Sequence, residues 1–296
     1  MKGIILAGGA GSRLYPLTQV ASKQLQPVYD KPMVYYPLST LLENGIREIA
    51  LISTPQDLPR FMEFLGDGSQ WGACITYLEQ PRPEGIAQAF IIADKFIDRE
   101  SVALILGDNI FYGAGQFEEA FKEHGTGATI FAYKVNDPAR YGVVEIDNSG
   151  RAISIEEKPK LPKSSYAVPG FYLFDSSVCQ LAEKLRPSAR GELEIADVMA
   201  DYMKQGTLEV RVLRRGVAWL DSGTSQSLHE AAAFVQTMEK RQGIKIGCPE
   251  EAALTAGLIS LDEFDTRIQY LPECEYKDYL SGISIEKHRF IPSKPY

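Results

Sequence analysis

The segment that most constrains this chain is its first 24 residues, which read MKGIILAGGAGSRLYPLTQVASKQ. A short apolar run, Ile4 to Ala7, leads directly into a glycine-rich loop, Gly8 to Arg13. Such a run ended by glycines is typical of a buried strand that enters a tight loop. Glycine lets the backbone approach a ligand closely, and successive N–H groups in such a loop can bind an anion. With Arg13 and Lys23 nearby, the loop predicts a phosphate site; the alternative is a plain strand-to-helix turn.

Two better-known glycine-rich motifs are excluded by the residues in this loop. A dinucleotide-binding G-x-G-x-x-G sequence would need a third glycine at position 14, where the chain has Leu14. A P-loop would need a Gly-Lys-Ser/Thr sequence, which this loop lacks. The spacing alone therefore leaves the phosphate site and the plain turn as equal alternatives.

Apolar strand-like segments alternate with amphipathic helix-like segments through the first half of the chain. The predicted strands cover 4–7, 49–52, 75–78, 102–106 and 128–133, and the predicted helices cover 58–65, 86–97 and 117–121. This alternation predicts an α/β fold with a Rossmann-like, mostly parallel mixed sheet flanked by helices. Ligands of such folds bind at the carboxyl ends of the strands, where the glycine-rich loop would lie.

The pattern changes after about residue 135. Strand-like segments at 143–146 and 152–155 flank the sequence Asp-Asn-Ser-Gly, which predicts a β-hairpin. Further strands are expected at 170–174, 208–213 and 217–220, and further helices around 178–185, 195–202 and 228–238. We expect one domain over 1–242, with halves at about 1–135 and about 136–242, followed by a C-terminal helical region over 243–296.

The composition excludes several classes of protein. A hydrophobic fraction of 45% and a charged fraction of 24% are ordinary for a globular chain. The net charge of -8 argues against a general nucleic-acid binder. No apolar segment approaches the ~20 residues that a membrane span needs. The 4 cysteines form no CxxC pair, so a reducing, cytoplasmic location is the simplest interpretation.

Two carboxylates follow apolar runs at predicted strand ends. Asp108 comes after the strand at 102–106, and Asp221 comes after the strand at 217–220. Two such side chains could share a hard cation such as Mg²⁺, which accepts a few carboxylates together with substrate phosphates. Taken singly, each is better explained as a turn residue, and their meeting depends on the fold.

Charged residues also end the predicted hairpin, in the sequence Glu156-Glu157-Lys158-Pro159. A lysine there could hold a sugar phosphate as a point charge, and the carboxylate beside it could accept hydrogen bonds from sugar hydroxyls. Viewed alone, this segment is better explained as an exposed charged turn. The histidines show no metal-binding or catalytic spacing and receive no role.

Taken together, these motifs resemble the sugar-1-phosphate nucleotidyltransferases, and the branch that joins dTTP to glucose 1-phosphate most of all. The resemblance spans nearly the whole chain. The matching segments are Leu6–Leu14, Ser22–Gln24, Tyr29–Met33, Gln80–Ala87, Gly107–Asn109, Tyr141–Val143, Glu156–Pro159, Gly170–Tyr172 and Trp219–Gly223. Ala10 and Ser12 vary the glycine-rich loop with residues that are also small.

The resemblance implies a reaction in which dTTP and glucose 1-phosphate give dTDP-glucose and pyrophosphate, with Mg²⁺ as cofactor. It also implies a GT-A-like fold, with the nucleotide bound by the first half and the sugar phosphate bound by a small β insertion in the second half. The attacking phosphate oxygen is already anionic, so catalysis rests on positioning and charge neutralisation rather than on a general base. Biosynthesis of dTDP-rhamnose and polysaccharide is the expected context.

The resemblance assigns three sets of site residues. The catalytic residues are Arg13, Lys23, Asp108, Lys158 and Asp221, of which Asp108 and Asp221 are the expected metal ligands. The nucleotide-binding residues are Leu6, Gly8, Gly9, Gly11, Ser12, Arg13, Gln24, Gln80, Pro83, Gly85 and Asp108, with the base read by Gln24, Gln80 and Gly85. The residues that bind the sugar phosphate are Tyr141, Gly142, Glu157, Lys158, Val168 and Trp219.

The C-terminal region over 243–296 resembles the addition that this family uses for packing into a homotetramer and for allosteric inhibition by an end-product nucleotide sugar. Two other functions stay open. One is a UDP- or ADP-sugar pyrophosphorylase of the same family, and the other is a non-catalytic regulator that binds a nucleotide sugar. An NAD-dependent oxidoreductase is disfavoured by Leu14.

Overall fold

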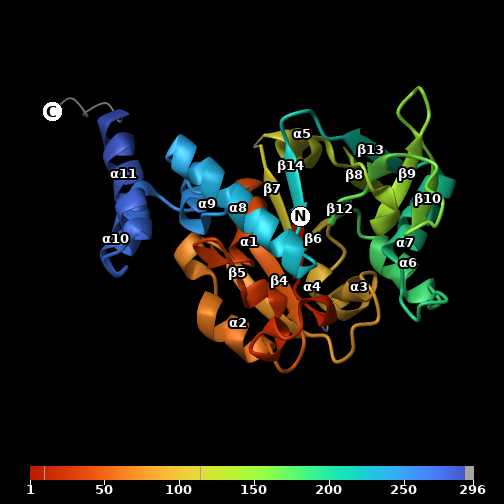
Figure 1. Ribbon diagram of the computed structural model, residues 1–296, viewed down its shortest axis with the longest axis horizontal. Coiled ribbons are helices and arrows are strands. Elements are labelled where there is room, and N and C mark those ends of the chain that lie inside the picture. Colours follow the sequence, from red (N-terminus) through yellow and green to blue (C-terminus); the bar gives the residue numbers. More distant parts are fainter. Residues whose placement is uncertain (10, 114, 291–296) are drawn as a thin grey trace.

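The computed structural model describes residues 1–9, 11–113 and 115–290 (Figure 1). Ala10 of the glycine-rich loop and residues 291–296 of the C-terminal region lie outside this part. The strands are β1 (Lys2–Leu6), β2 (Pro27–Val28), β3 (Lys31–Pro32), β4 (Glu48–Ser53), β5 (Cys74–Glu79), β6 (Val102–Leu106), β7 (Asn109–Tyr112), β8 (Ala128–Lys134), β9 (Gly142–Ile146), β10 (Ala152–Glu157), β11 (Tyr166–Ala167), β12 (Phe171–Phe174), β13 (Leu208–Val212) and β14 (Ala218–Asp221).

The helices are α1 (Tyr35–Glu43), α2 (Leu58–Leu65), α3 (Gln88–Ile92), α4 (Asp94–Ile97), α5 (Gln116–Glu123), α6 (Val178–Lys184), α7 (Ile195–Gln205), α8 (Ser225–Gln242), α9 (Pro249–Thr255), α10 (Leu261–Gln269) and α11 (Glu275–Phe290). None of these helices, as far as their residues are described, is long and apolar enough to cross a membrane.

A mixed sheet runs through the molecule. Among the described residues it has 10 strands, nine of them in the order β10-β9-β11-β8-β12-β6-β1-β4-β5, and β13 pairs with β8. The strands β6, β1, β4 and β5 are parallel to one another, whereas β12 runs antiparallel to β6 and β8. The chain winds from β1 to β4 and β5 on one side and returns to β6 on the other. The carboxyl ends of β1 and β6 therefore form the switch point at which such folds bind ligands.

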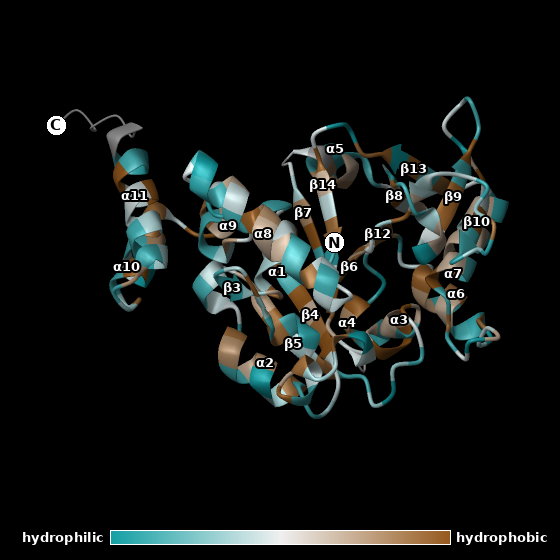
Figure 2. Cartoon of the chain, viewed as in Figure 1, coloured by the Kyte–Doolittle hydropathy of each residue, from teal (hydrophilic) through white to brown (hydrophobic). Residues whose placement is uncertain are grey.

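Helices cover both faces of the sheet, as the continuous apolar strands predicted. Along β1, Ile5 packs into one core with residues of α1, α2 and α9, and Ile4 packs into another with residues of α3, α6 and α7. Both isoleucines are almost fully buried, because successive side chains of a strand point to opposite faces. The central strands are accordingly mostly brown in Figure 2. The expected α/β fold is confirmed.

One expected helix is wrong, and several elements were missed, among them the two-residue strands β2, β3 and β11. The segment 86–97 forms the short helices α3 and α4, because Ala93 between them has φ -92° and ψ 6° and leaves the helical region. The helical spacing marked a buried face rather than a continuous helix. The sequence also gave no signal for β7 or for α1. Residues 36–42 of α1 are buried on every side, so this helix lacks an amphipathic pattern.

A two-stranded ribbon of β7 and β14 crosses the carboxyl edge of the sheet. The strands are antiparallel, and Asp221 is the partner of Asn109 in their register. The Ser222 N–H donates to the Asp108 carbonyl at 3.2 Å. Segments more than 100 positions apart in the chain thus meet beside the switch point.

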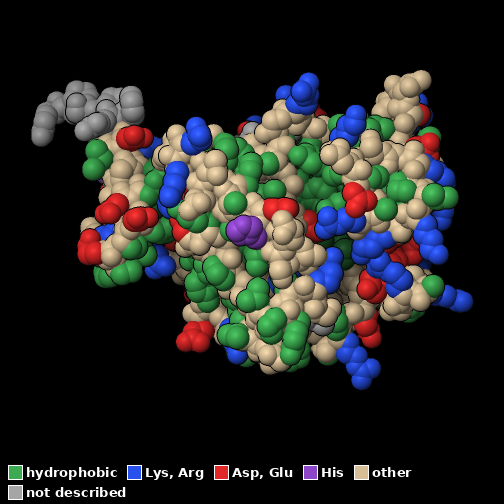
Figure 3. Space-filling view, viewed as in Figure 1, with side chains coloured by type: hydrophobic (Ala, Val, Ile, Leu, Met, Phe, Trp, Pro, Cys, Tyr) green, Lys and Arg blue, Asp and Glu red, His purple; other side chains and the backbone are tan. Residues whose placement is uncertain are grey.

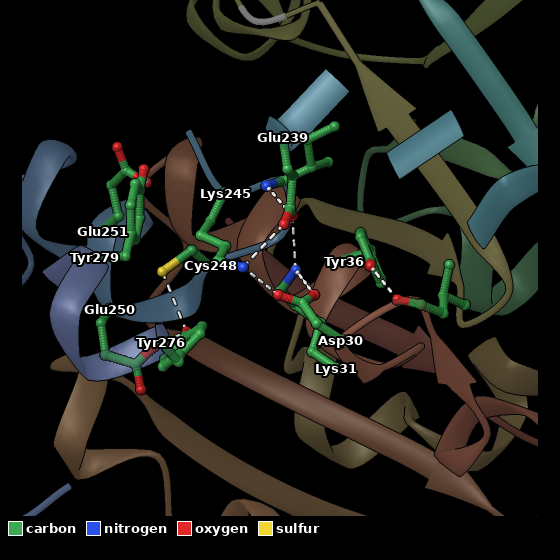
Figure 4. A network of polar contacts seen from close by, with 12 residues as sticks. Asp30, Lys31, Tyr36, Glu239, Lys245, Cys248, Glu250, Glu251, Tyr276 and Tyr279 are labelled. Atoms are coloured by element: carbon green, nitrogen blue, oxygen red, sulfur yellow. Dashed lines mark hydrogen bonds and ion pairs between the residues drawn. The ribbon is translucent and has the colours of Figure 1, made fainter. Parts of the chain in front are cut away.

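A buried ionic network joins the C-terminal region to the start of the chain (Figure 4). Lys31 Nζ lies 2.8 Å from Glu239 Oε1, and both side chains are at most 4% exposed. Lys245 Nζ lies 3.0 Å from the other oxygen of Glu239 and also pairs with Asp30. The Ile246 N–H donates to Glu239 at 2.9 Å. These contacts fix the end of α8 and the segment that leads into α9, whereas α10 and α11 pack together farther from the sheet (Figure 1).

We predict that Lys31→Met lowers the free energy of unfolding by about 3 kcal/mol, because it leaves a buried Glu239 with one cation fewer. The matched control is Lys122→Met, which removes an exposed ion pair with Glu118 on α5. It should change the free energy of unfolding by less than about 0.5 kcal/mol. Urea unfolding measures both. The double variant Lys31→Met/Glu239→Gln should recover part of the loss. Equal costs for Lys31→Met and the control Lys122→Met would contradict the stabilising role that we assign to the buried network.

Candidate active site

A cavity of about 320 Å³ opens at the carboxyl ends of β1, β5 and β6, beside β14 and the end of the β9–β10 hairpin. Most of the predicted site residues line it: Leu6, Gly8, Gly9, Arg13, Lys23, Gln24, Gln80, Pro83, Gly85, Asp108, Tyr141, Gly142, Glu157, Lys158, Val168, Trp219 and Asp221. Gly11 and Ser12 do not line it. They lie where the glycine-rich loop turns into a 3₁₀ helix at Ser12–Leu14.

Several residues that the sequence analysis missed also line the cavity. They are Ile86, Leu106, Asn109, Arg140, Gly170, Tyr172, Glu192, Ile195 and Met199. Arg140 and Asn109 adjoin predicted residues in the chain, so the motifs already pointed near them. Glu192, Ile195 and Met199 carry no such signal, because only the packing of α7 and of the segment before it brings them to the cavity.

The pairing of β1 with β6 places the glycine-rich loop beside Asp108. Leu6 and Leu106 are partners in the parallel register, and the Gly107 N–H donates to the Leu6 carbonyl at 2.9 Å. Glycine is needed at position 107, because a Cβ there would lie 2.8 Å from Gln24 Cγ and 3.1 Å from the Leu6 carbonyl oxygen. The strand ends can therefore approach each other closely, with their polar residues at one edge.

Lys23 and Asp108 form an ion pair inside the cavity. The other Asp108 oxygen accepts a hydrogen bond from Asn109 Nδ2 at 3.1 Å. Burial alone would raise the pKa of Asp108, but the charge and hydrogen bond of Lys23, with the bond from Asn109, outweigh it and lower the pKa. Asp108 is thus held as a carboxylate.

The pKa of Asp221 is shifted in the opposite direction. Burial and the nearby negative charge of Asp108 raise its pKa, against the opposing effects of Lys23, Arg13 and Arg140. The Arg13 guanidinium lies against the turn after Asp221, where a Cβ on Gly223 would be 3.0 Å from its terminal nitrogen. The structure therefore gathers two carboxylates that repel each other, surrounded by basic side chains.

These two carboxylates fit a magnesium ion. They offer the hard oxygen ligands that Mg²⁺ prefers, and a bound cation would relieve the repulsion that raises the pKa of Asp221. Among the described residues, no group of three or more His, Cys, Asp and Glu side chains could form a complete metal cage. A site with two protein ligands suits Mg²⁺, which commonly completes its shell with water and substrate phosphates.

The far wall of the cavity is built around Trp219. Its Nε1 donates to Asn109 Oδ1 at 2.6 Å, and the same oxygen accepts from the Gly170 N–H at 3.0 Å. The Tyr141 and Trp219 ring centroids are 4.9 Å apart. A single Asn side chain therefore ties the ribbon strand β14 to the residue that precedes β12 and fixes this aromatic wall.

Glu157 and Lys158 lie at the end of β10, next to the aromatic wall. Lys158 Nζ is 3.3 Å from Glu157 Oε1. Burial raises the pKa of Glu157, which Lys158 and Arg190 oppose. Lys158 has φ 43°, a left-handed conformation that is costly for a side chain with a Cβ and is concentrated at functional sites. The Lys158 N–H is tied to the Tyr141 carbonyl at 3.1 Å.

Charge of both signs gathers at this part of the surface. Figure 3 shows Lys and Arg side chains beside Asp and Glu in the right half of the molecule. A chain with a net charge of -8 thus provides local basic groups that can bind an anion.

Comparison with known proteins agrees with this geometry. The family model described as "Nucleotidyl transferase" matches residues 2–238. A glucose-1-phosphate thymidylyltransferase from Mycolicibacterium smegmatis is 55% identical over 281 residues, which cover 95% of this chain and 98% of the relative. A crystal structure from Bacillus anthracis, described as a glucose-1-phosphate thymidylyltransferase in complex with sucrose, is 44% identical with a TM-score of 0.74, over 79% of this chain and 94% of that chain.

A UDP-glucose pyrophosphorylase complexed with UDP-glucose shares the fold, with a TM-score of 0.72 at 19% identity, over 80% of this chain and 98% of that chain. The fold and the cavity thus define a nucleotidyltransferase. The chain belongs to the nucleotidyl transferase family, in its glucose-1-phosphate thymidylyltransferase group.

We predict that Gly85→Ala destabilises the wall that carries Gly85 and Gln80. Gly85 has φ 110°, and a Cβ there would lie 2.4–2.9 Å from backbone atoms of Leu193. Gly191→Ala is the matched control, because Gly191 has φ 77° but no atom near its Cβ position. The control should cost roughly 1–2 kcal/mol for its conformation, and Gly85→Ala roughly 1–3 kcal/mol more for overpacking. Denaturant unfolding measures both, and similar costs would contradict the clash.

Proposed function

We propose that this chain transfers a thymidylyl group from dTTP to glucose 1-phosphate and releases pyrophosphate. The observation that carries the proposal is the meeting of Arg13, Lys23 and Lys158 with Asp108 and Asp221 in one cavity. These residues come from five separate segments. The names of the relatives supply the substrates, and the cavity supplies groups that suit phosphate chemistry.

The chain's own residues contribute positioning and charge. A sugar phosphate oxygen attacks as an anion, so no general base is needed, and no histidine is found among the described residues that line the cavity. Lys158 would hold the sugar phosphate in line with the α-phosphorus of the nucleotide. Arg13, Lys23 and the amides of the glycine-rich loop would bind the triphosphate and the departing pyrophosphate.

Mg²⁺ is the cofactor that we propose, held by Asp108 and Asp221. When bound, it would neutralise negative charge on the phosphates. Lys23 pairs with Asp108 in this structure, so a metal at Asp108 would free Lys23 to contact a phosphate. The opposing pKa directions of the two carboxylates support this assignment.

The remaining site residues divide between the two substrates. Gln24, Gln80 and Gly85 would read the base, while Leu6, Gly8, Gly9 and Pro83 line its side of the cavity. Gly11 and Ser12 would act only through the shape of the loop. Tyr141, Gly142, Glu157, Val168 and Trp219 would bind the sugar, with the Glu157 carboxylate accepting hydrogen bonds from its hydroxyls.

The rest of the chain would serve assembly and regulation. We propose a catalytic domain over 1–242, with its two substrate-binding halves, and an oligomer-forming region over 243–296 that supports a homotetramer in the cytoplasm. An end-product nucleotide sugar would need a second site. A cavity of about 530 Å³ between α1, β7 and the segment Ile244–Cys248 is large enough for part of such a ligand. The product would then enter dTDP-rhamnose and polysaccharide biosynthesis.

We predict that Asp108→Asn and Lys158→Ala each lower kcat by roughly 10²–10³-fold while the fold is kept, because each removes charge placed at the reacting phosphates. Asp201→Asn, a carboxylate on α7 that pairs with Lys204, is the control and should keep wild-type turnover. Pyrophosphate release at varied Mg²⁺ measures the effect. A folded Asp108→Asn chain with a near-normal rate would remove the metal assignment.

We predict that pyrophosphate release requires dTTP, glucose 1-phosphate and Mg²⁺ together. Assays with dTTP, UTP, ATP and CTP in turn separate the alternatives. A clear preference for UTP or ATP would favour a UDP- or ADP-sugar pyrophosphorylase. Nucleotide-sugar binding without any pyrophosphate release would favour the non-catalytic regulator.

A further inference from the structure

Three polar side chains form a short relay beside the proposed base site. Gln88, the first residue of α3, is half-buried. Its Oε1 accepts from Gln80 Nε2 at 2.7 Å and from the Glu84 backbone N–H at 3.1 Å. Its Nε2 donates to Glu84 Oε2 at 2.8 Å.

The orientation of the Gln88 amide is fixed by partners that cannot change polarity. A backbone N–H only donates, and a carboxylate only accepts. Rotating the Gln88 amide by half a turn would place its NH₂ group against the Glu84 N–H and its oxygen against the Glu84 carboxylate. The segment around Glu84 is itself fixed, since the Leu193 N–H donates to the Glu84 carbonyl at 2.7 Å.

This fixed amide sets the orientation of Gln80 in turn. Because Gln88 presents an oxygen, Gln80 must turn its NH₂ group toward Gln88. The Gln80 Oε1 then lies over Gly8, 2.0 Å from where a Cβ of residue 8 would be. Gln80 is only 2% exposed and lines the cavity. It therefore offers the cavity a hydrogen-bond acceptor beside one remaining N–H.

The acceptor and the N–H that Gln80 offers distinguish thymine from cytosine. Thymine presents the N3–H donor beside the O4 acceptor, which complements an oxygen next to an N–H. Cytosine presents an N3 acceptor beside an N4 amino donor, the opposite pattern. A Gln80 amide that could rotate freely would accept either base.

We propose that Gln88 is a positioning residue that makes the site select thymine over cytosine by fixing the orientation of the Gln80 amide. The inference rests on the proposed function in one respect, that Gln80 meets the base. Gln88 itself does not meet the base. It acts through its hydrogen bond to Gln80, and Glu84 holds the Gln88 amide in place.

The test compares kcat/KM for dTTP and dCTP, with glucose 1-phosphate saturating, in wild type and Gln88→Met. Methionine has a similar length and cannot fix the amide of Gln80. The dTTP/dCTP ratio should fall roughly 10-fold, within the range for one bidentate base contact. Gln88→Ala is a second variant with the same expectation. Damage to the fold alone would lower both rates and leave the ratio unchanged.

The double variant Glu84→Gln/Gln88→Glu keeps an acceptor toward Gln80 and moves the charge. The carboxylate at position 88 would accept from Gln80 and from the backbone N–H of residue 84, and the new side-chain amide at position 84 would donate to it, where Glu84 accepts in the wild type. The double variant should retain the wild-type ratio. An unchanged dTTP/dCTP ratio in Gln88→Met and Gln88→Ala overturns the inference and leaves the proposed function standing. A double variant whose ratio falls as far as that of Gln88→Met has the same consequence. A wild-type chain that does not prefer dTTP over dCTP overturns both.

Discussion

The parallel pairing of β1 with β6 is the constraint on which the rest of the site depends. Because Leu6 and Leu106 are partners in register, the glycine-rich loop and Asp108 leave the same edge of the sheet side by side. The sheet order makes this edge the switch point. The ribbon of β7 and β14 adds Asp221 to it, and the β9–β10 hairpin adds Lys158.

Charge balance then explains what the cavity can hold. Its basic side chains are matched in number by its carboxylates, as far as the described lining residues go: Arg13, Lys23, Arg140 and Lys158 against Asp108, Glu157, Glu192 and Asp221. A triphosphate and a sugar phosphate would bring several further negative charges. A divalent cation at the two aspartates would offset part of them, which is the physical reason for the metal that we propose.

Much of the architecture could be predicted from the sequence, because buried strands and glycine-ended loops have local signals. The strands at the centre of the sheet and the loop at Gly8 were predicted this way. The meeting of Asp108 with Asp221 could not be, since it depends on a ribbon pairing between distant segments. For these two residues, as for Lys158, physical reasoning on isolated segments favoured plain turns, and only the resemblance to a family assigned them together.

Residues without a chemical pattern of their own stayed hidden. Helix α1 is buried on every side and shows no amphipathic period. Met199 reaches the cavity only through the packing of α7. Gln88 directly follows the motif Gln80–Ala87, yet its effect on Gln80 depends on which amide atom faces which partner, and only coordinates give that.

The central claim is that Asp108 and Asp221 hold one cation between them at the switch point. The most direct measurement is the anomalous diffraction signal of Mn²⁺, used in place of Mg²⁺, in crystals of this chain grown with dTTP. The account predicts one Mn²⁺ bound to oxygens of both carboxylates at about 2.1 Å, with Lys23 moved from Asp108 to a phosphate. A Mn²⁺ ion bound only by the triphosphate, with Lys23 still paired to Asp108, would contradict it.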